Sequence, residues 1–128
     1  MIPTEIISSF PLGVFNVHGS ILPKYRGAAP IIHSLLNGDN KTGVTIMEVK
    51  PNKFDVGDIL ASKEIDILPE DDRPKLTKRV GEIGAELLIE VLNDLDGYLM
   101  DKRKQDSSKI TYGNKTSVRV SHQVLFSG

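Results

Sequence analysis

Cysteine and tryptophan are both absent from the 128-residue sequence, and aromatic residues make up only 5% of it. Without cysteine, the chain has no disulfide scaffold, no zinc–thiolate site, no iron–sulfur cluster and no thiol nucleophile. No run of about 18 apolar residues is present, so we expect no membrane-spanning helix. The formal net charge of −1 argues against a surface that is basic throughout, as a dedicated nucleic-acid-binding domain would have.

Common cofactor motifs are also lacking. The sequence has neither a Gly-x-Gly-x-x-Gly loop nor a Walker-type loop, so dinucleotide and ATP binding have no support. Its three histidines lie far apart along the chain, so we expect no metal site. What remains is an ordinary composition, with 39% apolar and 26% charged residues, which predicts one globular domain.

Three short apolar segments predict β-strands. Leu12 to His18 is rich in β-branched and aromatic residues, which suits a buried parallel strand. Gly43 to Val49 predicts a second strand. Residues 59–67 alternate between apolar and polar side chains, which predicts a third strand with one solvated face.

Two helices are expected between and after these strands. Pro30 stands where a helix would start and Gly38 where it would end, with apolar residues at helical spacing between them. Apolar residues that recur every three or four positions from Leu76 to Leu99, after an acidic start at Asp72, predict one long helix. The alternation of strands and helices predicts an α/β fold.

Three polar residues are candidates for chemistry. Asn16 and His18 share one face of the first strand at its end, where ligands bind in open α/β sheets. Asp55 lies in a turn-prone connection between two strands. A histidine beside an amide and a carboxylate can polarise a carbonyl, stabilise an oxyanion and move a proton. Each also has a structural alternative, as a buried histidine, a loop cap or an Asx-turn, and spacing alone does not bring Asp55 to His18.

A continuous motif follows the first strand. It reads Asn16-Val-His18-Gly-Ser-Ile-Leu-Pro23-Lys-Tyr-Arg26-Gly27 and resembles the formyltetrahydrofolate-dependent formyltransferases. The continuation Gly27-Ala-Ala-Pro-Ile31 favours the methionyl-tRNA branch over the purine-synthesis and sugar-formylating branches. Residues 38–47 and 54–60 fit the same family, and the resemblance covers about residues 2–116.

The resemblance implies an enzyme that moves a formyl group from 10-formyltetrahydrofolate to the amino group of initiator methionyl-tRNA. Asn16, His18 and Asp55 fall on the family's catalytic positions. Asn16 and protonated His18 would bind the formyl oxygen as it becomes an oxyanion, while Asp55 would hold His18 charged and help relay a proton. Loss of one such donor typically costs ~3 kcal/mol.

Further residues are implied in substrate binding. Ser20, Ile21, Leu22 and Pro23 would shape the pterin side of the folate pocket, and Val44–Glu48 and Asp55–Gly57 its other walls, with Gly57 as a folate-binding residue. Lys24 and Arg26 would meet tRNA phosphate or the folate glutamate tail, although a solvated loop is an equal alternative. Neither a metal, a membrane nor DNA is expected as a partner.

The resemblance also defines the expected boundaries. Residues 1–116 would be the second half of a Rossmann-like formyltransferase domain, with a mixed, mostly parallel sheet and flanking helices, and residues 117–128 an unmatched tail. The family's N-terminal half and its tRNA-binding barrel are missing, so the chain would be inactive alone. A non-catalytic truncated product and a formyltetrahydrofolate-hydrolysing relative are the alternatives.

The compartment is suggested by one segment. Lys50-Pro-Asn-Lys-Phe-Asp-Val-Gly57 is closer to the organellar members of the family than to the bacterial ones. The mitochondrial matrix is therefore expected, with the cytoplasm as the alternative, although residues 1–3 open directly on core-like sequence with no transit peptide.

Overall fold

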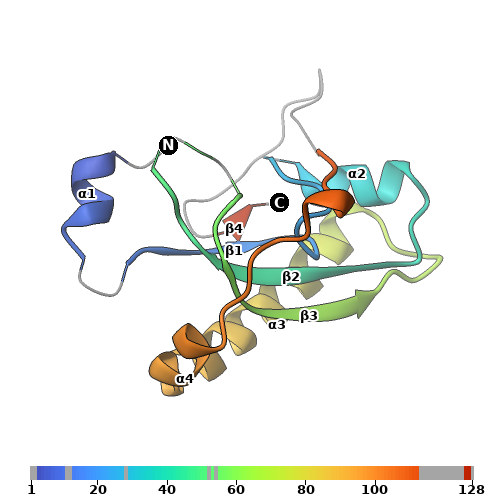
Figure 1. The fold of residues 1–128 in the computed structure, drawn as a ribbon. Coiled ribbons are helices and arrows are strands. Elements are labelled where there is room, and N and C mark those ends of the chain that lie inside the picture. Colours follow the sequence, from blue (N-terminus) through green and yellow to red (C-terminus); the bar gives the residue numbers. More distant parts are fainter. Residues whose placement is uncertain are drawn as a thin grey trace.

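The computed structural model describes residues 3–10, 13–27, 29–51, 53, 55–112 and 126–127. The elements, in chain order, are α1 (Thr4–Ser8), β1 (Phe15–His18), α2 (Pro30–Leu36), β2 (Lys41–Glu48), β3 (Ile59–Asp66), α3 (Arg73–Asn93), α4 (Leu95–Met100), the short 3₁₀ helix η1 (Ser107–Lys109) and β4 (Phe126–Ser127) (Figure 1). Most of the expected tail, residues 117–128, lies outside the described residues. None of the described helices is long and apolar enough to cross a membrane.

The strands form one sheet in the order β3-β2-β1-β4. β1 and β4 are parallel, whereas β1–β2 and β2–β3 are antiparallel. The α/β class and the mixed sheet are therefore confirmed, but the expectation of mostly parallel strands is wrong for the described strands. The C-terminal residue of β1, His18, pairs with Thr45, and the N-terminal residue, Phe15, pairs with Glu48. The connection from β1 therefore returns to the sheet at the end where β1 finishes, which makes β2 antiparallel to it.

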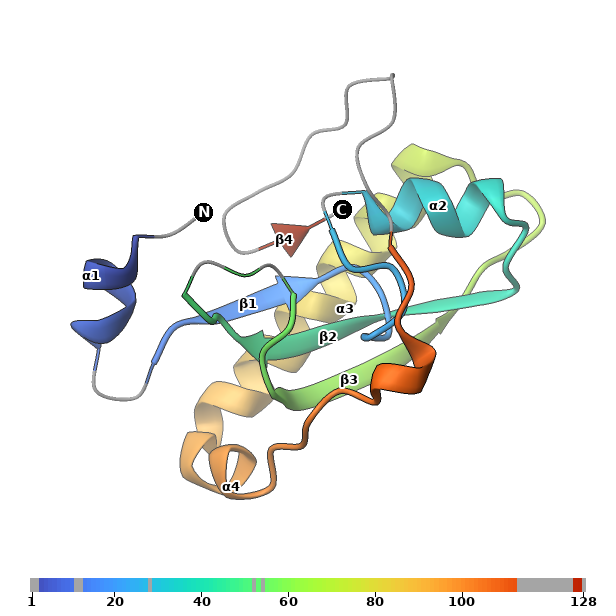
Figure 2. The ribbon, with the colours of Figure 1, turned by 45° about the horizontal axis from the view of Figure 1, so that its top comes forward.

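One face of the sheet is covered by α3, which lies behind the strands in Figure 2. Val17, Val44 and Ile46 pack there with the buried side of the helix, whose buried residues are Leu76, Val80, Gly84, Leu87 and Val91. The predicted start is confirmed, since the Asp72 side chain accepts the backbone N–H of Lys75 at 2.9 Å and caps the helix.

Two predicted boundaries are wrong. The long helix does not continue to Leu99 in one piece, because α3 ends at Asn93 and α4 begins at Leu95. Asp94 adopts a non-helical backbone, and its side chain accepts the N–H of Gly97, which is how aspartate competes with helix continuation. The first strand begins at Phe15 rather than Leu12, because Gly13 takes the left-handed φ of +94°, which interrupts an extended chain.

Candidate active site

The face of the sheet opposite α3, here called the site face, carries the candidate residues. Strand alternation puts Val17 in the core and its neighbours Asn16 and His18 on the site face. Asn16 pairs with Met47 and His18 with Thr45 across the β1–β2 ladder. His18 is fully buried and Asn16 is half-buried. The sequence-based placement of these two side chains on one face is therefore reproduced.

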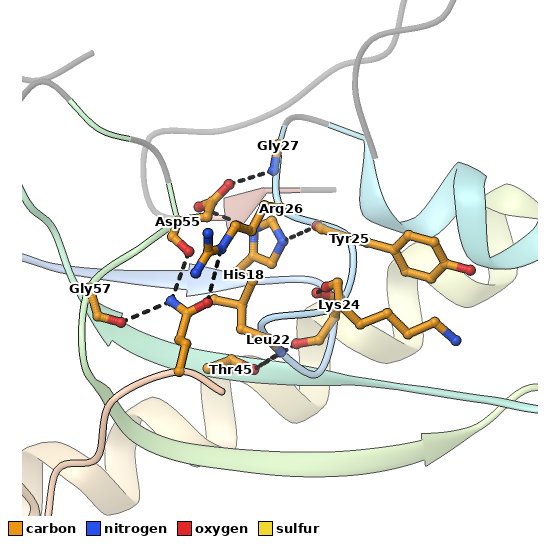
Figure 3. A network of polar contacts seen from close by, with 11 residues as sticks. His18, Leu22, Lys24, Tyr25, Arg26, Gly27, Thr45, Asp55 and Gly57 are labelled. Carbon is orange, nitrogen blue, oxygen red and sulfur yellow. Dashed lines mark hydrogen bonds and ion pairs between the residues drawn. The ribbon is translucent and has the colours of Figure 1, made fainter. Parts of the chain in front are cut away.

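The structure also brings Asp55 to His18, which spacing alone did not predict. Asp55 Oδ1 lies 3.4 Å from His18 Nδ1, and Asp55 Oδ2 accepts the backbone N–H of Gly27 at 2.7 Å. Figure 3 shows the carboxylate between the imidazole and Gly27. Asp55 adopts the left-handed φ of +56°, which is uncommon for a residue with a side chain. The turn between β2 and β3 thus aims this carboxylate at the end of β1.

The second ring nitrogen of His18 defines its tautomer. His18 Nε2 lies 2.7 Å from the backbone oxygen of Tyr25, and a carbonyl only accepts, so Nε2 donates its hydrogen. Burial lowers the pKa of His18, and the Asp55 charge and the Tyr25 carbonyl oppose that shift only in part. A neutral imidazole therefore presents the lone pair of Nδ1 toward Asp55, where an incoming proton would be shared with the carboxylate. The resemblance implies a charged His18 during the reaction; the resting site favours the neutral form.

The loop after β1 is held against β2 by Thr45. Thr45 Oγ1 donates to the backbone oxygen of Ser20 at 2.7 Å and accepts the N–H of Leu22 at 3.1 Å. The Leu22 side chain is buried with Met47 and Ile59. The loop is therefore fixed by both hydrogen bonds and apolar packing on the site face.

The predicted folate-binding residues are mostly buried, and their side chains take part in packing and in hydrogen bonds within the loop. Ser20, Leu22, Pro23 and Gly57 are buried, and Ile21 is half-buried. Ser20 Oγ donates to the Lys24 backbone oxygen. A Cβ on Gly57 would lie 1.8 Å from the backbone oxygen of Glu48, so glycine is required there by the approach of two segments. The Asp55 turn therefore packs directly against the end of β2.

The two predicted cationic residues point in different directions. In Figure 3 the Lys24 side chain extends away from His18, whereas Arg26 lies beside it. Lys24 Nζ pairs with Asp39 Oδ2 at 3.1 Å, while Arg26 Nε donates to Gln105 Oε1 at 3.1 Å. Lys24 is therefore not brought to the candidate catalytic residues, and Arg26 is.

Sequence reasoning missed two contributors in the irregular segment after α4. Gln105 Nε2 donates to the backbone oxygens of Asp55 and Gly57. Thr111 Oγ1 accepts the N–H of Tyr25 at 2.8 Å. Neither helical nor strand periodicity marks this segment, so its polar residues carried no signal of their own.

Tyr25 was also overlooked. Its backbone takes the left-handed φ of +57°, which turns the carbonyl toward His18. Its hydroxyl donates to Asp39 Oδ2 at 2.6 Å and accepts from Asn37 Nδ2 at 2.7 Å. The side chain therefore anchors the loop to the end of α2 while the backbone orients His18.

The His18–Asp55 pair is suited to proton transfer. A fully buried imidazole with one nitrogen committed to a carbonyl and the other facing a carboxylate can accept a proton and stabilise the charge that results. Among the described residues, no group of three metal-ligating side chains converges.

The sequence matches known proteins over much of its length. A model described as formyl transferase matches residues 1–92. The mitochondrial methionyl-tRNA formyltransferase of Rattus norvegicus is 42% identical over 121 residues, which make up 94% of this chain and 31% of that protein. The methionyl-tRNA formyltransferase of Sulfurihydrogenibium sp. is 44% identical over 112 residues, 88% of this chain and 36% of that protein. The chain thus spans about a third of the length of these curated relatives.

A solved structure shares the fold. The N-formyltransferase of Helicobacter canadensis, in complex with folinic acid and dTDP-3-aminofucose, superposes with a TM-score of 0.75 and is 25% identical. The superposition covers 87% of this chain and 41% of that chain. The fold of this chain is therefore one that a formyltransferase solved in complex with folinic acid also has.

Proposed function

The chain belongs to the formyl transferase family. We propose that it supplies the catalytic residues for the transfer of a formyl group from 10-formyltetrahydrofolate to the amino group of methionyl-tRNA. The observation that carries this proposal is the buried pair at the end of β1, with His18 Nδ1 and Asp55 Oδ1 separated by 3.4 Å. The acceptor is proposed from the identity of 42–44% to methionyl-tRNA formyltransferases.

The reaction forms a bond between the methionyl nitrogen and the formyl carbon and breaks the bond from that carbon to N10 of the folate. A proton must leave the amine and another must reach N10. We assign the proton transfer to His18, whose neutral imidazole is ready to accept, and we assign Asp55 to stabilise the imidazolium that forms. Asn16, on the same face, would donate to the developing oxyanion.

The folate would lie against the loop after β1. Ser20–Pro23 and Gly57 would line the pterin side of the pocket. The buried His18 Nδ1 makes no hydrogen bond within the described residues and faces Asp55 Oδ1 at 3.4 Å, so a proton taken from a reacting group would be held between them. Arg26, beside His18, would meet an anionic part of the folate or the tRNA, and the same role for Lys24 would require it to leave Asp39.

The extent of the domain and its compartment are also proposals. Gln105 and Thr111 bind the loop and the Asp55 turn, so we include residues beyond the family match, up to 116, in the catalytic domain, and we treat 117–128 as a tail. The relatives include mitochondrial and bacterial proteins, and we propose the mitochondrial matrix from the organellar form of residues 50–57.

A graft tests the proposal independently of chain length. This chain replaces the 121 matched residues of the rat mitochondrial protein, and formyl-methionyl-tRNA is measured after incubation with 10-formyltetrahydrofolate and methionyl-tRNA. We expect the graft to be active, and we expect His18→Ala to lower its rate by a factor of about 10²–10⁴.

The control is Leu92→Ala, which shortens a side chain on α3 that is 58% exposed and is expected to leave most of the activity. A graft that folds but keeps its activity in His18→Ala would contradict the proposal. Formate released without methionyl-tRNA, at the rate of the complete reaction, would instead assign a formyltetrahydrofolate hydrolase.

A further inference from the structure

Gln105 lies at the junction of three segments that surround the candidate catalytic pair. Its Nε2 donates to the backbone oxygens of Asp55 at 2.7 Å and Gly57 at 2.9 Å, and its Oε1 accepts from Arg26 Nε at 3.1 Å. Both amide hydrogens are therefore used within the turn that carries Asp55. The same side chain ties this turn to the loop after β1.

The turn needs such a restraint. Asp55 holds a left-handed φ of +56°, and a conformation of this kind persists in a residue with a side chain only where the surroundings impose it. The Gly27 N–H fixes one carboxylate oxygen, but it does not fix the peptide group of Asp55. Gln105 provides the contact to that peptide group.

Gln105 is itself presented on a fixed backbone. On its N-terminal side, Arg103 exchanges two backbone hydrogen bonds with Ile59, at 2.7 and 3.0 Å. On its C-terminal side, Thr111 accepts from the Arg26 N–H at 2.9 Å and donates to the Pro23 oxygen at 3.2 Å. The segment is therefore attached to β3 before Gln105 and to the loop after β1 beyond it. Figure 2 shows its path in front of the sheet.

We propose that Gln105 is a positioning residue that holds the Asp55 turn so that the carboxylate faces His18. The inference rests on the proposed function for its importance to the reaction, but its geometric content does not depend on any activity. Gln105 acts through Asp55 and need not touch a substrate.

The test reads the His18 titration in the purified chain. The pKa of His18 is followed by the NMR signal of its imidazole carbon, assigned by its absence in His18→Ala, in the parent, in Asp55→Asn and in Gln105→Met. Methionine keeps the length of the side chain and removes all three hydrogen bonds. The matched control is Ser107→Ala, an exposed change two residues further along the same segment.

Because the Asp55 charge raises the pKa of His18, Asp55→Asn should lower that pKa by about 1 unit or more. We expect Gln105→Met to give a reduction of the same sign, roughly half as large or more, and no further reduction when combined with Asp55→Asn. Ser107→Ala should leave the parent value.

A purely structural role predicts the opposite. Loosened packing would admit water to His18 and raise its pKa toward the ordinary value, and it would do so in the Asp55→Asn background as well. That result, or an unchanged pKa in Gln105→Met, overturns the proposal. Gln105→Asn, which retains an amide on a shorter side chain, replaces the methionine variant if the latter does not fold.

The graft separates this inference from the proposed function. There, Gln105→Met should lower kcat more than it changes KM for 10-formyltetrahydrofolate. If the parent graft does not transfer formyl groups, the proposed function fails while the titration still decides the role of Gln105.

Discussion

On the face of the sheet that packs against α3, Val17, Val44 and Ile46 meet an apolar helix surface. The opposite, site face carries the paired residues His18 and Thr45, and it is the face turned away from α3 in Figure 2. The first face is stabilised by apolar burial, which has no preferred direction. The second combines apolar packing of Leu22, Met47 and Ile59 with hydrogen bonds whose partners must be placed within a few tenths of an ångström.

This difference separates stability from chemistry. A buried apolar side chain can be replaced by another of similar volume at modest cost. A buried polar group left without its partner loses its full solvation. The α3 face therefore sets how stable the domain is, and the site face sets where His18 and Asp55 lie. The predictions below test that division.

The largest effect is expected on the α3 face. Leu76→Ala removes a side chain that is 0% exposed, and such substitutions typically lower the free energy of unfolding by about 2–5 kcal/mol. Leu92→Ala, on the same helix, removes one that is 58% exposed and should change it by less than about 0.5 kcal/mol. Urea unfolding followed by circular dichroism measures both, and equal losses would contradict the division.

A smaller effect on stability, with a direct effect on the site, is expected at Gly57. In Gly57→Ala the new Cβ would lie 1.8 Å from the Glu48 oxygen, so the Asp55 turn must move away from β2. We expect a loss of about 1–3 kcal/mol in the free energy of unfolding and a lower pKa for His18 as Asp55 withdraws.

Gly81→Ala is the control, because it has nothing within 4 Å of its new Cβ. Alanine is the better helix former, so this variant should raise the free energy of unfolding by up to about 1 kcal/mol. The same substitution is thus expected to change the free energy of unfolding in opposite directions at the two positions. A Gly57→Ala chain as stable as the parent would show that the turn is not held where we place it.

The α3 face was the more predictable of the two. Helical spacing from Leu76 to Val91 and the capping signal at Asp72 are properties of neighbouring residues, and the structure confirms both. The break at Asp94 was not predictable from apolar periodicity, because the periodicity continues to Leu99 across it. The strand directions were missed because they depend on where residues 19–40 re-enter the sheet.

The site face was predictable only in part. Asn16 and His18 follow from strand alternation. Asp55 was a candidate from its turn-prone connection, but only the family resemblance, which the comparisons confirm, connected it with His18. The contacts of Asp55 depend on a left-handed turn and on Gln105, 50 residues away in the chain. No local pattern encodes such a contact, so the side chains that position the site appear only in the folded structure.

The last prediction uses proton binding to separate the two faces at a single residue. His18 is fully buried, and burial lowers its pKa below the ordinary 6.5. As pH falls below 6.5, the unfolded chain takes up a proton at this histidine before the folded chain does. The free energy of unfolding must therefore decrease, by at most about 1.4 kcal/mol per pH unit, and this contribution is constant above that range. The Asp71–Arg79 pair does not interfere, because it lowers the pKa of Asp71 below 3.8, outside the window.

Urea unfolding at pH 7.5, 6.5 and 5.5 should show the decrease in the parent and a smaller one in His18→Gln, while Leu92→Ala keeps the parent slope. An identical pH dependence in the parent and in His18→Gln would mean that the folded and unfolded chains protonate this imidazole alike, and that the site face does not hold it neutral.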